Sequence, residues 1–156
     1  MPSLSIPSPI GQLTIEANNQ AIVAIRWAAD PGATDPAGAA TPLLKEAGRQ
    51  LQAYFAGRLH HFDLPLAAGG TGFERRVWDA MCAIPYGETR SYGDLAHAVD
   101  SGPRAVGGAC GKNPIPIVVP CHRVLARGGL GGYSGGTGLP TKQFLLHLES
   151  RLRKAA

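Results

Sequence analysis

The chain has 156 residues, a formal net charge of +4 and a pI near 9.2, and 44% of its residues are hydrophobic. That length allows one compact unit or two small subdomains and is sufficient to bury a core. No apolar run approaches the roughly 20 residues of a membrane span, and the N-terminus lacks a cationic segment followed by an apolar one. We therefore predict a cytoplasmic protein without a membrane partner, whose basic charge permits DNA binding without establishing it.

Cysteine and histidine spacing argues against bound metal. The three cysteines are an odd number without Cys-x-x-Cys spacing, which disfavours both a disulfide framework and a cysteine-based metal site. His60 and His61 are adjacent, and adjacent side chains on an extended segment point to opposite faces. No third ligand accompanies them, so we predict no metal and no cofactor.

The first third of the chain is predicted to be structural. Alternating residues in 3–28 favour a hairpin, with strands at 13–15 and 22–25 around a turn at 17–20. Residues 29–40 are typical of a loop. Thr41 and Pro42 then suit an N-cap and first helical position, and apolar residues recur at helical spacing up to Gly57. We predict a sheet-and-helix subdomain over 1–68, with its boundary in the loop 67–71.

Three helical segments follow. The first begins at Phe73, with Val77, Trp78 and Met81 predicted to face inward, and it ends before residue 85. A helix over 92–99, capped by the serine at 91, and a helix from residue 104 form a predicted helix-turn-helix.

The helix from Arg104 is poor in large side chains, because Ala105, Gly107, Gly108 and Ala109 follow. Glycine inside a helix costs about 1 kcal/mol relative to alanine, so the bare backbone requires a reason. An ordinary helix is about 10–12 Å across, whereas the DNA minor groove is about 6 Å wide, so small residues suit entry into that groove. Close packing on another helix explains them equally well. Arg104 favours nucleic acid, because a cation at a helix N-terminus opposes the macrodipole unless it has an external partner.

A buried strand is predicted over 115–119, after a break at Asn113 and Pro114, and Pro120 ends it. Cys121 then lies at the rim of the strand, beside His122.

Cys121 is the candidate nucleophile. A cysteine attacks as a thiolate and needs a base or a positive environment, which His122 could provide. Because neighbouring side chains on extended backbone diverge, contact between the two needs a tight turn or a bridging water. Most buried cysteines are inert, and we expect this of Cys82 and Cys110. Cys121 differs in following a proline and preceding His122 and Arg123.

The remaining residues form a glycine-rich loop over 127–138 and a last helix over about 141–153. The loop, around Tyr133 and Ser134, is either a mobile surface segment or a pocket wall. The helix is predicted to bury Phe144, Leu145 and Leu148.

Several motifs, in this order, resemble those of the O6-alkylguanine-DNA alkyltransferase family. They are Ile-Pro-Tyr-Gly-Glu-Thr at 84–89, Ser-Tyr at 91–92, Arg-Ala-Val-Gly-Gly-Ala at 104–109, Asn-Pro at 113–114, Pro-Cys-His-Arg-Val at 120–124 and Gly-Tyr-Ser-Gly-Gly at 132–136. A bare Pro-Cys-His-Arg would be weak evidence, whereas these matches cover half of the chain. The segment 100–103 is shorter than expected for the family.

The resemblance implies an α/β (α+β) fold, with a small N-terminal subdomain and a mostly helical C-terminal subdomain, 69–156, that contains the helix-turn-helix. It implies a DNA repair enzyme, a methylated-DNA–protein-cysteine S-methyltransferase. Such a protein moves methyl or alkyl groups from O6 of guanine, and from O4 of thymine, in double-stranded DNA to Cys121, irreversibly and once per molecule. The target base is flipped out through the minor groove. We expect a monomer.

The resemblance also implies roles for individual residues. Glu149 orients His122, which activates Cys121 through water, while Tyr92 rotates a phosphate and protonates the leaving guanine. Arg104 replaces the extruded base. The other implied DNA contacts are Ser91, Ala105, Gly108 and Arg123. The implied pocket residues are Asn113, Pro120, Tyr133 and Ser134.

Two other functional classes remain open. One is a DNA-binding module without transfer chemistry, which the presence of Cys121 disfavours. The other is a cysteine hydrolase using Cys121 and His122, which would have no use for a bare helix.

Overall fold

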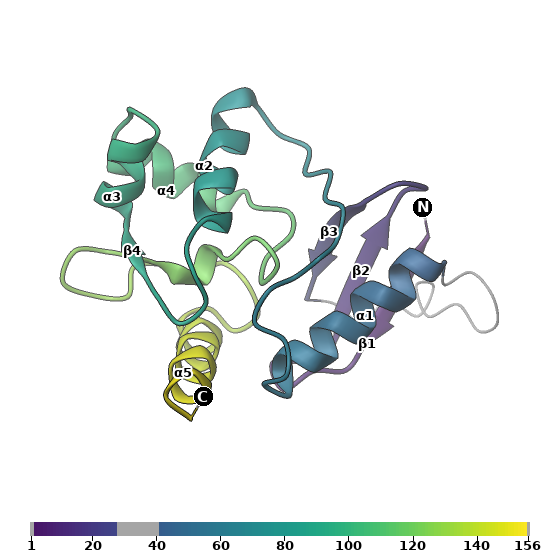
Figure 1. Ribbon diagram of the computed structural model, residues 1–156. Helices are drawn as coiled ribbons and strands as arrows, with labels where there is room; N and C mark the ends of the chain where they lie inside the picture. Colours follow the sequence, from purple (N-terminus) through teal and green to yellow (C-terminus); the bar gives the residue numbers. More distant parts are fainter. Residues whose placement is uncertain (1, 28–40, 156) are drawn as a thin grey trace. The chain divides into compact units, whose positions relative to one another are not determined.

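The computed structural model describes residues 2–27 and 41–155, with backbone alone for 151–155 (Figure 1). The predicted loop at 29–40 lies outside the described residues. The chain divides into two compact units, Met1–Gly69 and Gly70–Ala156. No helix within the described ranges combines the length and apolarity needed to cross a membrane.

The first unit is a three-stranded antiparallel sheet with one helix along it (Figure 1). Its strands are β1 (Ser3–Ile6), β2 (Leu13–Ala17) and β3 (Ile22–Arg26), in the order β1-β2-β3. The predicted hairpin is confirmed as β2 and β3, with Ile15 paired to Ile25. Its turn closes on the Asn18 side chain, which accepts from the backbone N–H groups of residues 20 and 21. The prediction of two strands missed β1, whose four residues are too few for a clear alternation.

Helix α1 (Pro42–Phe55) confirms the predicted cap, since the Thr41 side chain accepts from the backbone N–H of Leu44. Its apolar face is buried against the sheet through Leu44, Ala47, Leu51 and Tyr54. The mixed α and β architecture agrees with the predicted fold class.

The second unit is mostly helical. Its helices are α2 (Gly72–Cys82), α3 (Tyr92–Ala98), α4 (Pro103–Gly111) and α5 (Leu139–Ala155), with a short 3-10 turn, η1 (Cys121–Arg123). Two-residue strands β4 (Arg90–Ser91) and β5 (Val124–Leu125) pair in parallel, Arg90 with Val124 and Ser91 with Leu125. This ladder joins the entrance of α3 to the residues directly after η1.

The predicted helix-turn-helix is present as α3 and α4, which pack on each other. Ser91 caps α3 by accepting from the Asp94 N–H at 2.9 Å, and the Asp94 carboxylate accepts from the Ser91 N–H at 2.9 Å. The turn passes through Asp100 at φ 55, a conformation that aspartate tolerates better than most residues. Because α3 ends at Ala98 and α4 begins at Pro103, residues 99–102 form the whole turn, and the short segment 100–103 leaves α4 intact.

The burial of single residues in this unit confirms some predictions and corrects others. Val77, Trp78 and Met81 are buried as predicted, and Trp78 donates from Nε1 to the Ala109 carbonyl at 2.9 Å. Ala109 therefore belongs to the core of this unit. Cys82, predicted to be buried filler, is exposed. It ends α2 one residue after the buried Met81.

The apolar face of α5 is narrower than predicted. Leu145 and Leu148 are buried, whereas Phe144, predicted to face inward, is 38% exposed. Consecutive residues on a helix point about 100° apart, so Phe144 lies off the face that Leu145 and Leu148 share.

The strand predicted over 115–119 is wrong. These residues are buried, but they form a turn, in which the Val119 N–H donates to the Ile115 carbonyl at 2.9 Å and Ile117 takes φ 74. The Asn113 side chain closes it by accepting from the Ile115 N–H at 3.0 Å and donating to the Val119 carbonyl at 2.8 Å. Proline has no N–H for a strand ladder, and Pro114 and Pro116 interrupt the segment.

Candidate active site

A cleft of about 1060 Å³ opens in the second unit between the start of α3, helix α4 and the loop after β5. Predicted site residues on its lining are Ser91, Tyr92, Arg104, Cys121, Tyr133 and Ser134. Two predicted pocket residues are not on it. Pro120 is buried, and Asn113 is half-buried in the turn that precedes Cys121.

Cys121 reaches this cleft because the chain turns tightly at η1. The Cys121 N–H donates to the Val119 carbonyl at 2.8 Å, and the Arg123 N–H donates to the Pro120 carbonyl at 3.0 Å. The turn leaves Cys121 half-buried on the lining of the cleft, while His122 and Arg123 are buried. The tight turn therefore places these adjacent residues at different depths.

Behind Cys121, a buried carboxylate joins two basic side chains. His122 Nε2 lies 2.7 Å from Glu149 Oε2, and both side chains are at most 1% exposed. Arg123 donates to the same carboxylate, from Nε to Oε1 at 2.8 Å and from Nη2 to Oε2 at 3.1 Å. Its Nη1 donates to the Ile84 carbonyl at 2.7 Å. The prediction that Arg123 contacts DNA is therefore wrong, because its guanidinium is buried and bound within the protein.

The protonation of this group follows from its burial and charges. Burial opposes ionisation of Glu149, but His122 and Arg123 outweigh it and lower the pKa of Glu149 to about 2. Burial also lowers the pKa of His122, so its imidazole is neutral at neutral pH. A neutral imidazole that donates from Nε2 to Glu149 has its lone pair on Nδ1. Nδ1 is buried and has no hydrogen-bond partner among the described residues.

Opposing influences act on the pKa of the Cys121 thiol. Burial raises the pKa of the Cys121 thiol, while hydrogen bonds from Asn113 and Tyr133 and the charge of Lys142 lower it. These groups favour the thiolate, although the resting thiol retains its proton. The site therefore holds a nucleophile that needs a base, and the neutral His122 beside it can act as one.

Lys142, on α5, is a site residue that the sequence reasoning missed. Its side chain is fully buried, and Nζ donates to the carbonyls of Val124, Leu130 and Gly132 at 2.7, 2.5 and 3.1 Å. Nζ also lies 5.9 Å from the centre of the Tyr92 ring. A lysine is rarely buried without partners. The partners of Lys142 are backbone carbonyls far away along the chain, so the sequence does not reveal them. The available signal was its spacing of seven residues from Glu149, which places both on one face of a helix.

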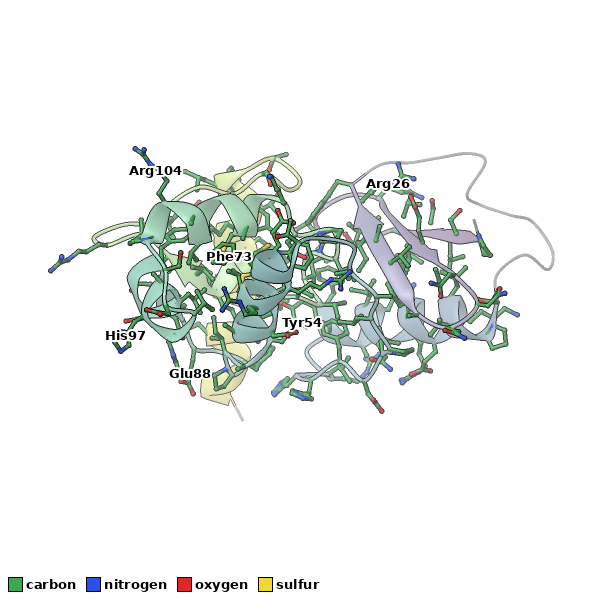
Figure 2. The ribbon with its side chains drawn as sticks, turned by 90° about the horizontal axis from the view of Figure 1, so that it is seen from above. Arg26, Tyr54, Phe73, Glu88, His97 and Arg104 are labelled. Atoms are coloured by element: carbon green, nitrogen blue, oxygen red, sulfur yellow. The ribbon has the colours of Figure 1, made fainter. Side chains whose placement is uncertain are left out.

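Helix α4 exposes a face of small residues. Arg104, Ala105 and Gly108 are exposed, and Figure 2 shows Arg104 extending outward from the start of the helix. A Cβ added at Gly108 would meet no atom within 4 Å. Packing against the described residues therefore does not require a glycine at this position.

Comparisons with known proteins agree in both units of the chain. Residues 72–151 match the family described as 6-O-methylguanine DNA methyltransferase, DNA binding domain, and residues 4–68 match its ribonuclease-like domain. A methylated-DNA–protein-cysteine methyltransferase of Mycobacterium tuberculosis is 45% identical over 160 residues, which cover 93% of this chain and 90% of that protein.

Solved structures are similar as well. The crystal structure of Mycobacterium tuberculosis OGT in complex with DNA has a TM-score of 0.86 at 43% identity, and covers 97% of this chain and 94% of that one. An O6-methylguanine DNA methyltransferase from Methanococcus jannaschii has a TM-score of 0.68 at 29% identity, covering 94% and 93%. On the strength of both comparisons and of the Cys121 site, the chain belongs to the 6-O-methylguanine DNA methyltransferase family.

Proposed function

We propose that this chain repairs double-stranded DNA by moving a methyl or alkyl group from O6 of guanine to the sulfur of Cys121. The observation that carries the proposal is a half-buried cysteine on the lining of a cleft, followed in the chain by a neutral, carboxylate-bound His122. Family membership supports the same chemistry. DNA binding and transfer are assigned to residues 69–156 and a structural role to 1–68, because every site residue lies in the second unit.

The transfer is one displacement at a saturated carbon. The Sγ–C bond forms as the O6–C bond breaks, with the two bonds in line and without an oxyanion. The thiol proton passes through water to Nδ1 of His122, and Glu149 stabilises the resulting imidazolium. The leaving guanine anion takes a proton from Tyr92, whose pKa is raised by burial, so that its hydroxyl is protonated before transfer.

The target atom lies inside a base pair, so the nucleotide must be flipped out at a cost of a few kcal/mol. In the proposal α4 enters the minor groove through Ala105 and Gly108, and Arg104 fills the place of the extruded base. Tyr92 rotates the adjacent phosphate, and Ser91 contacts the backbone. These residues belong to the helix-turn-helix or its cap, and those on the cleft share it with Cys121.

The product is a thioether, which no side chain of the described site is equipped to cleave. Each molecule therefore acts once. The same displacement applies to an alkyl group on O4 of thymine, which we include as a second substrate. We further propose that the protein acts as a monomer in the cytoplasm, where a free thiol stays reduced.

Mass spectrometry after incubation with a duplex containing O6-methylguanine tests the proposal. One methyl group per molecule, on Cys121 and in stoichiometric yield, is the expected result. A DNA-binding module would show no adduct, and a cysteine hydrolase would release product in large excess over protein. Either outcome would overturn the assignment.

A further inference from the structure

The loop after β5 carries a tight turn whose tip is Arg127. The Gly129 N–H donates to the Ala126 carbonyl at 3.2 Å, the two residues form an antiparallel bridge, and Gly128 takes φ 84. Arg127 is exposed and lines the same cleft as Cys121. The turn thus presents an arginine beside the nucleophile.

Both arms of this turn are attached to α5. Lys142 Nζ donates to the carbonyl of Val124 before the turn and to those of Leu130 and Gly132 after it. The lysine is fully buried and its bond to Val124 is buried with it, while the bonds to Leu130 and Gly132 are partly buried, so breaking them would leave a buried cation without its partners. The loop is therefore held in one position by a cation beneath it.

A close contact between Gly131 and Tyr92 also constrains the loop. Gly131 takes φ 73, and a Cβ there would lie 2.9 Å from Cε2 of Tyr92 and 3.2 Å from the backbone nitrogen of Ala126. Glycine alone permits so close an approach at this φ. The position of Arg127 is consequently linked to Tyr92, which lies on the helix-turn-helix.

The charges on the cleft favour an anion. Among its lining residues, the cationic side chains are Arg104, from α4, and Arg127, from the turn. The acidic side chain on the lining is Asp94, whose carboxylate already accepts the Ser91 N–H. Within the described ranges, no side chain forms an ion pair with Arg127. A guanidinium matches the oxygens of a phosphate, and because the loop is held in place its backbone loses little entropy when Arg127 binds one.

We propose that Arg127 binds a phosphate of the DNA backbone and positions the duplex on the cleft together with Arg104. This inference rests on the proposed function. Arg104 acts in the groove, whereas Arg127 acts on the backbone and does not contribute to base flipping. Arg127 thus determines how tightly DNA is held, and not how fast the bound nucleotide reacts.

The test compares the full-length protein with Arg127→Ala and Arg127→Lys, and with Arg75→Ala as a control for charge. Arg75 is exposed on α2 and does not line the cleft. Affinity for an unmodified duplex is measured over a range of salt concentrations. Loss of one phosphate contact lowers the slope of log affinity against log salt by about 0.9. The affinity deficit of Arg127→Ala should therefore shrink about 3.5-fold between about 50 and 200 mM salt.

Two further measurements separate this role from others. With O6-methylguanine duplex at saturating concentration, Arg127→Ala should transfer at the wild-type rate but need more DNA to reach half of it. Its reaction with free O6-benzylguanine should be unchanged, which shows that the pocket is folded. Arg127→Lys should restore the slope, because lysine also neutralises a phosphate.

An unchanged salt slope in Arg127→Ala, or an equal reduction in Arg75→Ala, would overturn the inference while leaving the proposed function intact. Failure of the wild-type protein to methylate Cys121 would overturn the proposed function instead. A wild-type protein that does not bind duplex DNA would overturn both.

Discussion

The surroundings of the three cysteines differ at the scale of single residues. Burial raises the pKa of Cys110 to about 12, and the pKa of Cys82 is raised as well. Burial raises the pKa of Cys121 too, but there it is opposed by hydrogen bonds from Asn113 and Tyr133 and by the charge of Lys142. Cys121 is also the one of the three that precedes His122, so we expect it to be the thiol that reacts.

The corresponding variants test this expectation. Cys121→Ser should abolish transfer, because a hydroxyl scarcely ionises in the same setting, and should leave DNA affinity largely intact. Cys82→Ser and Cys110→Ser should both retain transfer. Adduct formation and duplex binding are measured for all three, and full activity of Cys121→Ser would contradict the assignment.

The Glu149 carboxylate should set the basicity of His122. In Glu149→Gln the imidazolium loses its stabilising charge, so the pKa of Cys121 should rise. The rate of Cys121 alkylation by O6-benzylguanine should fall about 10- to 100-fold at neutral pH and recover as the pH increases. Glu88→Gln, a change at a carboxylate paired with Arg90 outside the buried group, is the matched control.

Two outcomes decide this prediction. Superimposable pH profiles for Glu149→Gln and the wild-type protein would mean that His122 acts without the carboxylate. A change of equal size in Glu88→Gln would point to a general electrostatic effect.

The role of helix α4 can be tested by substitution, first at Arg104 near its N-terminus. Arg104→Ala should slow transfer from duplex DNA about 10- to 100-fold, since it removes part of the stabilisation of the flipped state. Reaction with free O6-benzylguanine, which needs no flipping, should change little. Comparable losses on both substrates would instead assign Arg104 to the fold or the pocket.

Substitutions at the small residues of α4 distinguish effects on stability from effects on function. Gly108→Ala should stabilise the protein by about 1 kcal/mol, because alanine is the better helix former and the space is open. Gly108→Leu should also fold, yet should lose most transfer from duplex DNA while reacting normally with O6-benzylguanine. Thermal melts and both transfer assays check these outcomes. Destabilisation by alanine would show that the helix packs there after all.

The helices and strands that could be predicted are those whose sequence signals lie within the element itself. The caps at Thr41 and Ser91 and the helical spacing after them were sufficient to place α1 and α3. Residues 115–119 were misassigned because a run of β-branched residues indicates burial and not conformation. Lys142 and Arg123 could not be placed from the sequence, because their partners are 10 to 39 residues away along the chain.

At the scale of the whole molecule, the buried Glu149 predicts loss of stability in acid. Its pKa is about 2 in the folded chain and near 4.5 when unfolded, so its contribution is complete above about pH 4.5 and disappears as the pH falls toward 2. That shift corresponds to about 3 kcal/mol. His122, whose pKa is lowered by burial, adds a further loss below its ordinary value of 6.5.

Urea unfolding at several pH values measures this effect. The chain has two tryptophans, and in a Trp27→Phe background the fluorescence of Trp78 reports on the second unit. The difference in unfolding free energy between this protein and its Glu149→Gln variant should be constant above about pH 5 and close as the pH falls. A difference independent of pH would show that Glu149 is not ionised in the fold.

The short ladder between β4 and β5 has a consequence for which properties of the protein a mutation can alter. It ties the first residue before the helix-turn-helix to the residues after the Cys121 turn through backbone alone. The position of Cys121 is thus tied to α3 by main-chain pairing, whereas Tyr133 and Ser134, two of the predicted pocket residues, line the cleft with their side chains. Under the proposed function, mutation of Tyr133 or Ser134 should therefore alter the size of the group removed without displacing Cys121 from the helix-turn-helix.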